Sequence, residues 1–440
     1  MQLITRRKAK GERPKVLRLT SHVSRLAAFV LLAPCSLLKG DCPRFTDGAS
    51  LRRRIGTVPV IMLLTAYGLV LTGSARAEDR FSVKYQHYED DKSIYYKDAK
   101  GVTSDRWLIA ISKAITEKTS LALNYGVDAI SSASWKVDGV TSATKRAGEE
   151  TRYSGGLGLN HTIGTVNYSA NLGLSRENNY NSNYLSASVA KDYNKRNTTV
   201  ALSVSKAWDD IYSTKIGDSR TFPMSKDTST VGLSFTQALT PWTIAAIGHE
   251  YTMAEGYQAH PENVVCLDCT SINRAYTDEV HPETRYRNAS VLRINRYLPW
   301  RGALHADYRY YHDSWGVGSN TLGLKYYQYL SDDLVLRLRG RFYTQGAADF
   351  YFKNPSATDS YPTIDGKLRE FDSLMYGVKL IYNATKAAGK AGIKVGEKIN
   401  LDLKWDVYQQ ADAITSPTKV AGPSTGLKAS IVQVGLGMEF

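Results

Sequence analysis

Residues 399–408 read INLDLKWDVY. Apolar and polar side chains alternate throughout, so Leu401 and Leu403 share one face while Asp402 and Lys404 share the other. A helix would bring every third or fourth residue together, and this period of two therefore predicts a β-strand with one apolar and one polar face.

The same alternation recurs along the rest of the chain, in segments of about ten residues. We predict sixteen such strands, with boundaries good to about two to four residues, at 81–91, 105–115, 120–134, 151–162, 166–178, 182–192, 197–208, 228–239, 242–255, 285–297, 302–313, 319–330, 334–346, 368–383, 397–410 and 427–440.

The connections between these segments fall into two classes. The link after every second segment is short, apart from 384–396, whereas long polar links follow several of the others, at 135–150, 209–227, 258–284 and 347–367. Short turns at one rim and long loops at the other are typical of bacterial outer-membrane barrels. The prediction is an all-β, transmembrane, antiparallel up-and-down β-barrel of about 16 strands, with 14 or 18 as the alternatives.

The end of the chain carries the most specific signal for this fold. Val434, Leu436 and Met438 alternate with glycine and glutamate, and the strand finishes on the terminal aromatic Phe440. This pattern resembles the C-terminal signal by which the barrel assembly machinery recognises its substrates. The alternative is an edge strand that ends in phenylalanine by chance.

Residues 51–77 have the features of a secretory signal peptide. Three arginines at 52–54 precede an apolar run at 55–70, and the segment ends in small residues up to Ala77. Cleavage after Ala77 is expected, with an uncleaved anchor as the alternative. Residues 1–50 form a basic extension ahead of this signal, and we hypothesise that translation starts near Leu51 and that the extension is not translated. The barrel then comprises residues 78–440.

The net charge of +14 is concentrated in the segment that precedes the barrel. Residues 1–77 hold 14 Lys/Arg and 3 Asp/Glu, whereas the remaining 363 residues hold 42 and 39. Removal of the leader leaves a net charge of only +3, so nucleic acid is not expected as a partner. The 29 tyrosines suit the membrane interfaces, where a ring with an apolar body and a polar tip is favoured.

A series of motifs in the second half goes beyond periodicity. They read RYR at 285–287, NRYL at 295–298, YRYYHDSWG at 308–316, RFYTQ at 341–345 and ADFY at 348–351. Together they are similar to the uncharacterised outer-membrane family catalogued as domain of unknown function 3570. The resemblance implies an outer-membrane barrel in a Gram-negative bacterium, over about residues 78–440, and no established activity. It also implies an association with periplasmic redox proteins.

A basic track is expected on the polar, lumen-facing side of four consecutive strands. Its members are Arg287, Arg293, Arg309, Lys325, Arg337, Arg339 and Arg341. Such a track would attract anionic solutes by electrostatic focusing. The alternative is an ordinary solvated lining whose charges are paired with neighbours such as Asp307.

Cys266 and Cys269 are the only cysteines of the expected mature chain and fall in its longest external loop. A disulfide that staples this loop is the main prediction, because the bacterial envelope is oxidising. Metal binding and a redox role are the alternatives, although only His260 and His281 lie nearby as further ligands.

No catalytic constellation stands out, and no cofactor or metal is expected. His305, Asp307, His312 and Asp313 are candidate acid–base residues, and the first two share the lumen face of one strand, but no convincing nucleophile accompanies them. The predicted function is a porin-like conduit, or an outer-membrane component of an envelope redox or transport system. An embedded hydrolase and a non-conducting scaffold that presents its loops to partners are the alternatives. Lipid and the barrel assembly machinery are the expected partners.

Overall fold

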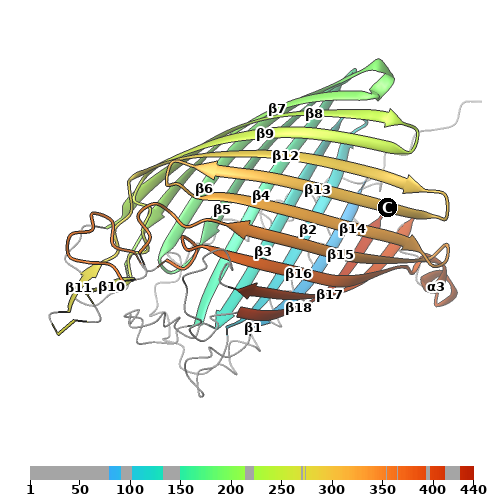
Figure 1. Ribbon diagram of the computed structural model, residues 1–440. Coiled ribbons are helices and arrows are strands. Elements are labelled where there is room, and N and C mark those ends of the chain that lie inside the picture. The colour runs from blue at the N-terminus through green and yellow to red at the C-terminus, as the bar shows by residue number, and fades with distance from the viewer. Residues whose placement is uncertain are drawn as a thin grey trace, which may run out of the picture. The chain divides into compact units, whose positions relative to one another are not determined.

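The chain forms a closed antiparallel β-barrel of sixteen strands (Figure 1). The computed structural model describes residues 79–90, 102–131, 149–213, 222–268, 271–272, 274–352, 354–363, 365–392, 397–411 and 427–440. The predicted leader, residues 1–77, and Cys269 lie outside these residues. The barrel strands are β1 (Arg80–Asp90), β2 (Thr103–Thr116), β3 (Thr119–Ser131), β4 (Glu149–Ile163), β5 (Val166–Arg176), β6 (Tyr180–Tyr193), β7 (Thr198–Ile211), β8 (Met224–Thr240), β9 (Thr243–Gly256), β12 (Thr284–Leu298), β13 (Gly302–Asp313), β14 (Gly318–Tyr329), β15 (Leu334–Gln345), β16 (Phe371–Asn383), β17 (Lys398–Ala411) and β18 (Leu427–Glu439).

Each strand pairs with its neighbours in sequence, and the barrel closes where β1 pairs with β18. The register at this closure runs from Arg80 opposite Glu439 to Asp90 opposite Ala429. The predicted up-and-down topology with sixteen strands is therefore confirmed. Within the described residues, no helix has the length and apolar character needed to span a bilayer.

The strand boundaries differ most from the predicted ones at the end that carries the long loops. There β7 continues to Ile211 and β8 begins at Met224, within the predicted loop 209–227. Asp209 and Lys226 face each other in these extensions, with the Lys226 Nζ 3.1 Å from the Asp209 Oδ2. The alternation rule missed this paired segment because consecutive polar residues, Asp209–Asp210 and Ser225–Lys226–Asp227, interrupt the alternation.

Alternate side chains define the outer and inner faces of the barrel. Leu233, Leu403 and Val434 are 58%, 52% and 50% exposed, although they are apolar. Apolar side chains exposed on a closed barrel are stable against hydrocarbon, where the paired strands leave no backbone group unsatisfied. The outer face is thus the lipid-facing side of an outer-membrane type of barrel, and the intervening polar residues line the lumen.

Turns at one rim of the barrel are tight. Gly164 and Thr165 join β4 to β5, and Gly164 has a φ of 61°, a left-handed conformation that glycine adopts without strain. The exception at this rim is the connection from β16 to β17, which contains the short helix α3 (Thr385–Lys390). Figure 1 shows α3 at the end of the barrel opposite the long loops.

Two long loops at the other rim fold together into a compact unit, which we call the folded loop region. It comprises the described residues of 257–283, with the hairpin β10 (Val264–Leu267) and β11 (Ala275–Asp278), and those of 346–370. The two loops are joined by backbone hydrogen bonds from Asp268 N to Pro355 O, 2.9 Å, and from Val280 N to Pro362 O, 3.1 Å.

Glu279 is the polar centre of the folded loop region, and its side chain is fully buried. Its carboxylate accepts hydrogen bonds from Thr363 Oγ1 at 2.6 Å and from Asn263 Nδ2 at 2.8 Å, and His281 Nε2 lies 3.6 Å away. Burial by itself would raise the pKa of this carboxyl, but the hydrogen bonding and charge of His281, with the bonds from Thr363 and Asn263, lower the pKa to about 2.

This lowered pKa predicts that the folded loop region loosens in acid. The Glu279 contribution is complete above the ordinary glutamate pKa of 4.5 and is lost as the pH falls from there toward 2. The loss is about 3 kcal/mol, since one pKa unit corresponds to about 1.4 kcal/mol. Pepsin cleavage within 257–283 should therefore increase over this interval. In Glu279→Gln, the region should already be sensitive at pH 5, because an amide cannot accept all of the bonds that the carboxylate accepts.

The matched control is Glu255→Gln, at the exposed end of β9, which should retain the wild-type profile. Identical pH profiles for wild type and Glu279→Gln would contradict this account of the loop region.

Candidate functional site

All seven residues of the predicted basic track lie on the inner face of the barrel. On β15, Arg337, Arg339 and Arg341 alternate with the outward-facing Leu338 and Phe342, which are both exposed. The remaining members occupy the equivalent inner positions of β12, β13 and β14, namely Arg287, Arg293, Arg309 and Lys325.

Three further cations belong to the same surface. Their side chains also lie at inward-facing positions of the alternating strands, and they are Arg285 on β12, Lys379 on β16 and Lys404 on β17. We call these three residues and the seven of the predicted track the basic wall. The period of two that identified the seven would also have identified these three.

The carboxylates of this wall are recessed. Asp307, Asp402 and Asp406 each lie directly across the strand pair from a glycine. These glycines, which we call the glycine seats, are Gly323, Gly435 and Gly377. A Cβ at any of the three would overlap the facing carboxylate. Absence of a side chain therefore lets each carboxylate lie flat against the sheet.

Cations cover two of these recessed carboxylates, Asp406 and Asp402. Arg339 donates from Nε to Asp406 Oδ1 at 2.7 Å and from Nη2 to Oδ2 at 2.5 Å, while the Lys404 Nζ lies 3.1 Å from the same Oδ2. Asp406 is left 0% exposed. Lys379 pairs with Asp402 at 2.9 Å in the same way. At Asp402 and Asp406 the lumen consequently meets ammonium and guanidinium groups, with the carboxylates behind them, whereas the Asp307 side chain stays 32% exposed.

Several cations of the basic wall have no carboxylate partner. Among the described residues, the structure records no ion pair for Arg287, Arg293, Arg337 or Arg341. The Nε and Nη2 atoms of Arg337 are buried and also lack a hydrogen-bond acceptor there. Positive charge therefore exceeds negative charge along this side of the lumen.

The opposite side of the barrel has a different lining. Inner positions of β3 to β8 are mostly occupied by glycine, alanine, serine, threonine and asparagine, as in Gly156, Gly158, Ser186, Ser203 and Gly232. These small side chains add little bulk to the interior, so among the described residues this side of the lumen is a low neutral wall that differs from the basic wall.

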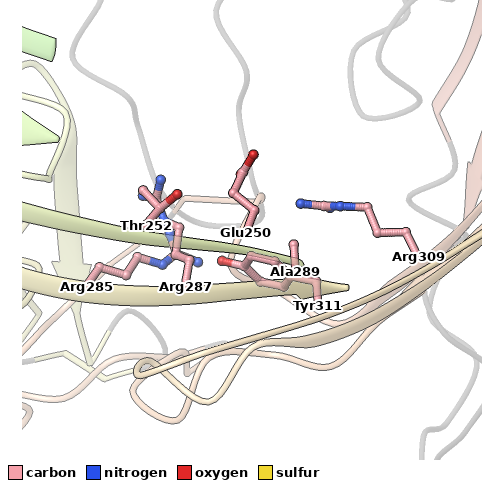
Figure 2. Close-up of a pocket in the computed structure, with 7 residues that line it drawn as sticks. All are labelled: Glu250, Thr252, Arg285, Arg287, Ala289, Arg309 and Tyr311. Carbon is pink, nitrogen blue, oxygen red and sulfur yellow. The ribbon is translucent and has the colours of Figure 1, made fainter. Parts of the chain in front are cut away.

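A hollow of about 270 Å³ lies in the basic wall near the folded loop region (Figure 2). Its lining residues come from β9, β12 and β13 and are Glu250, Thr252, Arg285, Arg287, Ala289, Arg309 and Tyr311. Figure 2 shows Arg309 extending from one side toward Glu250, with the small Ala289 between them. Its guanidinium lies over the Tyr311 ring, 5.4 Å from the centroid.

Asp313 orders one edge of this hollow. It accepts hydrogen bonds from Arg285 Nε at 2.8 Å and from Tyr311 Oη at 2.6 Å. Arg285 also lies over the ring of Trp315, 4.1 Å from its centroid. Trp315 belongs to a buried cluster with Val317, Ala348 and Leu368, so the folded loop region and the upper lumen share one packed core.

The candidate acid–base residues do not form a catalytic arrangement among the described residues. Asp307 faces Lys325 at 3.9 Å, and His305 packs on Tyr327 with ring centroids 4.9 Å apart. Asp313 is held by Arg285 and Tyr311. His312 is two residues from the outward-facing Tyr310 and four from Tyr308, so it lies on the outer face of β13.

The remaining predicted sites lie in the folded loop region and at the C-terminus. Cys266 is buried in β10 and disulfide-bonded, while its expected partner Cys269 is outside the described residues, so that pairing stays a prediction. In the described part of the chain no three His, Cys, Asp or Glu residues are grouped so as to hold a metal ion. Phe440 follows β18, and its N donates to Asp79 O at 3.0 Å. Its recognition during assembly, with that of Val434, Leu436 and Met438, also stays a prediction.

Comparison with known proteins identifies a family by sequence. A family model described as "Protein of unknown function (DUF3570)" matches residues 61–424. No curated protein matches the chain.

Similar solved structures include a bacterial polysaccharide outer membrane secretin, with a TM-score of 0.42, 7% identity, and coverage of 83% of this chain and 100% of that one. A mutant of the ferric enterobactin receptor PfeA from Pseudomonas aeruginosa gives a TM-score of 0.40 at 12% identity, covering 80% of this chain and 56% of the receptor. The siderophore receptor PirA from Acinetobacter baumannii gives 0.39 at 10% identity, covering 83% and 60%. The chain thus spans less than two thirds of either receptor.

The glycine seats lead to a prediction about stability. Gly377→Ala should lower the free energy of unfolding by about 1–3 kcal/mol, because the added methyl group overlaps Asp406 and the β17 backbone. Gly340→Ala on the neighbouring strand β15 is the matched control: its methyl group meets nothing within 4 Å, and its effect should stay within about 0.5 kcal/mol. Urea unfolding in lipid vesicles, followed by tryptophan fluorescence, measures both. Equal effects of the two substitutions would show that the seats do not constrain the wall.

Proposed function

The chain belongs to this family of unknown function, and we propose that it is a porin-like conduit for small anions in the outer membrane of a Gram-negative bacterium. The observation that carries the proposal is the layering of the basic wall, in which cations cover recessed carboxylates such as Asp406. A solute in the lumen would encounter the cations first.

Electrostatics favour anions in such a lumen. A low-dielectric wall that carries one sign of charge focuses its field into the enclosed water and raises the local concentration of counter-ions. Arg293 and Arg337 have no ion-pair partner among the described residues, so their charge is not offset within the wall.

The size of the barrel also supports a conduit. Eight-stranded barrels fill their interior with side chains, whereas barrels of sixteen to eighteen strands are wide enough to leave an aqueous channel. Here the sixteen strands combine with a lining of small residues on one side, which does not add bulk. The proposal implies lipid around the outer face and the barrel assembly machinery as partners.

The proposal predicts anion selectivity in planar bilayers. The full chain, purified from outer membranes, should give stable conductance steps whose reversal potential in a KCl gradient indicates preference for chloride. Arg293→Gln combined with Arg337→Gln should lower the chloride-to-potassium permeability ratio about threefold or more, because two uncompensated charges leave the lumen. Selectivity should also weaken between 0.1 and 1 M salt, since the screening length falls from about 10 Å to about 3 Å.

Arg296→Gln is the matched control. Arg296 lies on the outer face of β12, on the same side as Leu292 and Ile294, and is close to the rim with the short turns. It should leave the permeability ratio unchanged. Stable insertion without conductance would refute the conduit and favour a scaffold that presents the folded loop region to a partner.

A further inference from the structure

A second hollow lies in the basic wall, between β15, β16 and β17, and has a volume of about 220 Å³. These three strands lie side by side in Figure 1. The lining residues are Arg341, Tyr343, Phe371, Ser373, Met375 and Tyr408.

Aromatic rings form the sides of this hollow. Tyr343 and Phe371 lie together on one side, with ring centroids 5.5 Å apart and planes inclined by 39°. Tyr408 is on β17, and between it and Tyr343 runs β16 with the small, buried Ser373. The register places Tyr343 opposite Ser373 and Tyr408 opposite Met375, so the two rings are diagonally related across β16 and the short Ser373 leaves space beside Tyr343.

Both tyrosine rings are held in place by glutamines two residues further along the same strand. Tyr343 Oη donates to Gln345 Oε1 at 2.5 Å, and Tyr408 Oη donates to Gln410 Oε1 at 3.1 Å. Gln345 Nε2 donates in turn to Lys367 O and Arg369 O, at 2.8 and 2.6 Å. Rings ordered before a ligand arrives lose little conformational entropy when it binds.

Among the described residues that line this hollow, Arg341 is the charged one. Its guanidinium is 5.9 Å from the centroid of the Tyr343 ring, and no ion pair is recorded for it among the described residues. Among the described residues, the buried Asp406 pairs with Arg339 and Lys404, and no ion pair joins it to Arg341.

We propose that this hollow is a binding subsite for a small aromatic carboxylate within the lumen. A guanidinium binds a planar carboxylate through two parallel hydrogen bonds, and the ring of the ligand would pack against Tyr343, Phe371 and Tyr408. The volume suits one substituted ring, because pockets for drug-sized ligands are about 300–1,000 Å³. An inorganic anion would leave the three rings unused.

This inference specifies the class of solute that the proposed conduit would carry, and it rests on the proposed function. The hollow of Figure 2 differs because its lining includes Glu250, which opposes an anion, and only one aromatic ring. It therefore provides an internal control of similar size in the same wall.

Binding is tested by isothermal titration of the full chain in detergent with benzoate, cyclohexanecarboxylate, benzyl alcohol and inorganic phosphate. Benzoate should bind tightest, because only benzoate has both the ring and the carboxylate. Arg341→Gln should weaken benzoate about tenfold or more, since a charged hydrogen bond is lost. Ser373→Leu should abolish binding by filling the hollow without changing its charge.

Ala289→Leu, which fills the other hollow, and Arg293→Gln with Arg337→Gln should keep benzoate affinity within about twofold of wild type, because these residues do not line the subsite. Far-UV circular dichroism confirms that each variant retains the barrel. Equal affinity for benzoate and phosphate, or full benzoate affinity in Arg341→Gln, would overturn the subsite.

The same titration separates this inference from the conduit. Benzoate binding by a protein that does not conduct would refute the conduit but retain the subsite. Anion-selective conductance without benzoate binding would retain the conduit and refute the subsite.

Discussion

The constraint on which this structure depends is the need of every backbone amide in hydrocarbon for a hydrogen-bond partner. A sheet satisfies that need only when it has no free edge, and here the pairing of β1 with β18 removes the last one. Closure then separates the side chains of every strand into two environments. Residues such as Leu233 and Leu403 face outward, and their neighbours face a shared interior. All of the chemistry available to the protein must come from those inner positions and from the loops.

The inner positions are distributed unequally around the barrel. Strands β12 to β17 carry the basic wall, whereas β3 to β8 carry small neutral residues. The glycine seats add a second asymmetry, perpendicular to the sheet, because Gly435 and Gly377 let Asp402 and Asp406 lie beneath the cations. A wall whose sequence contains both cations and carboxylates can thus present mainly positive charge to the lumen. That layering connects local backbone geometry to the proposed selectivity.

The loops contribute order as well as length. Glu279 holds the folded loop region together through its buried hydrogen bonds, and Trp315 joins that region to Arg285 at the upper lumen. Gln345 plays a similar part at the same rim, since it fixes the Tyr343 ring while it bonds to the carbonyls of Lys367 and Arg369. Within the described residues, loop and lumen are therefore coupled by specific contacts.

The amino-acid sequence by itself determined the strand count, the order of the strands and the face on which each residue lies. It could do so because a period of two is a local property of an extended chain, and Arg337, Arg339 and Arg341 need no partner to share a face. The same local rule failed at the extensions of β7 and β8, where consecutive polar residues interrupt the alternation. Only the tertiary structure decided which residues face each other across strands, because register sets those pairs and no single strand encodes it. Three features arise from this register. They are the contact of Asp406 with Gly377, the ion pair of Arg339 with Asp406, and the hollow lined by Tyr343 and Tyr408.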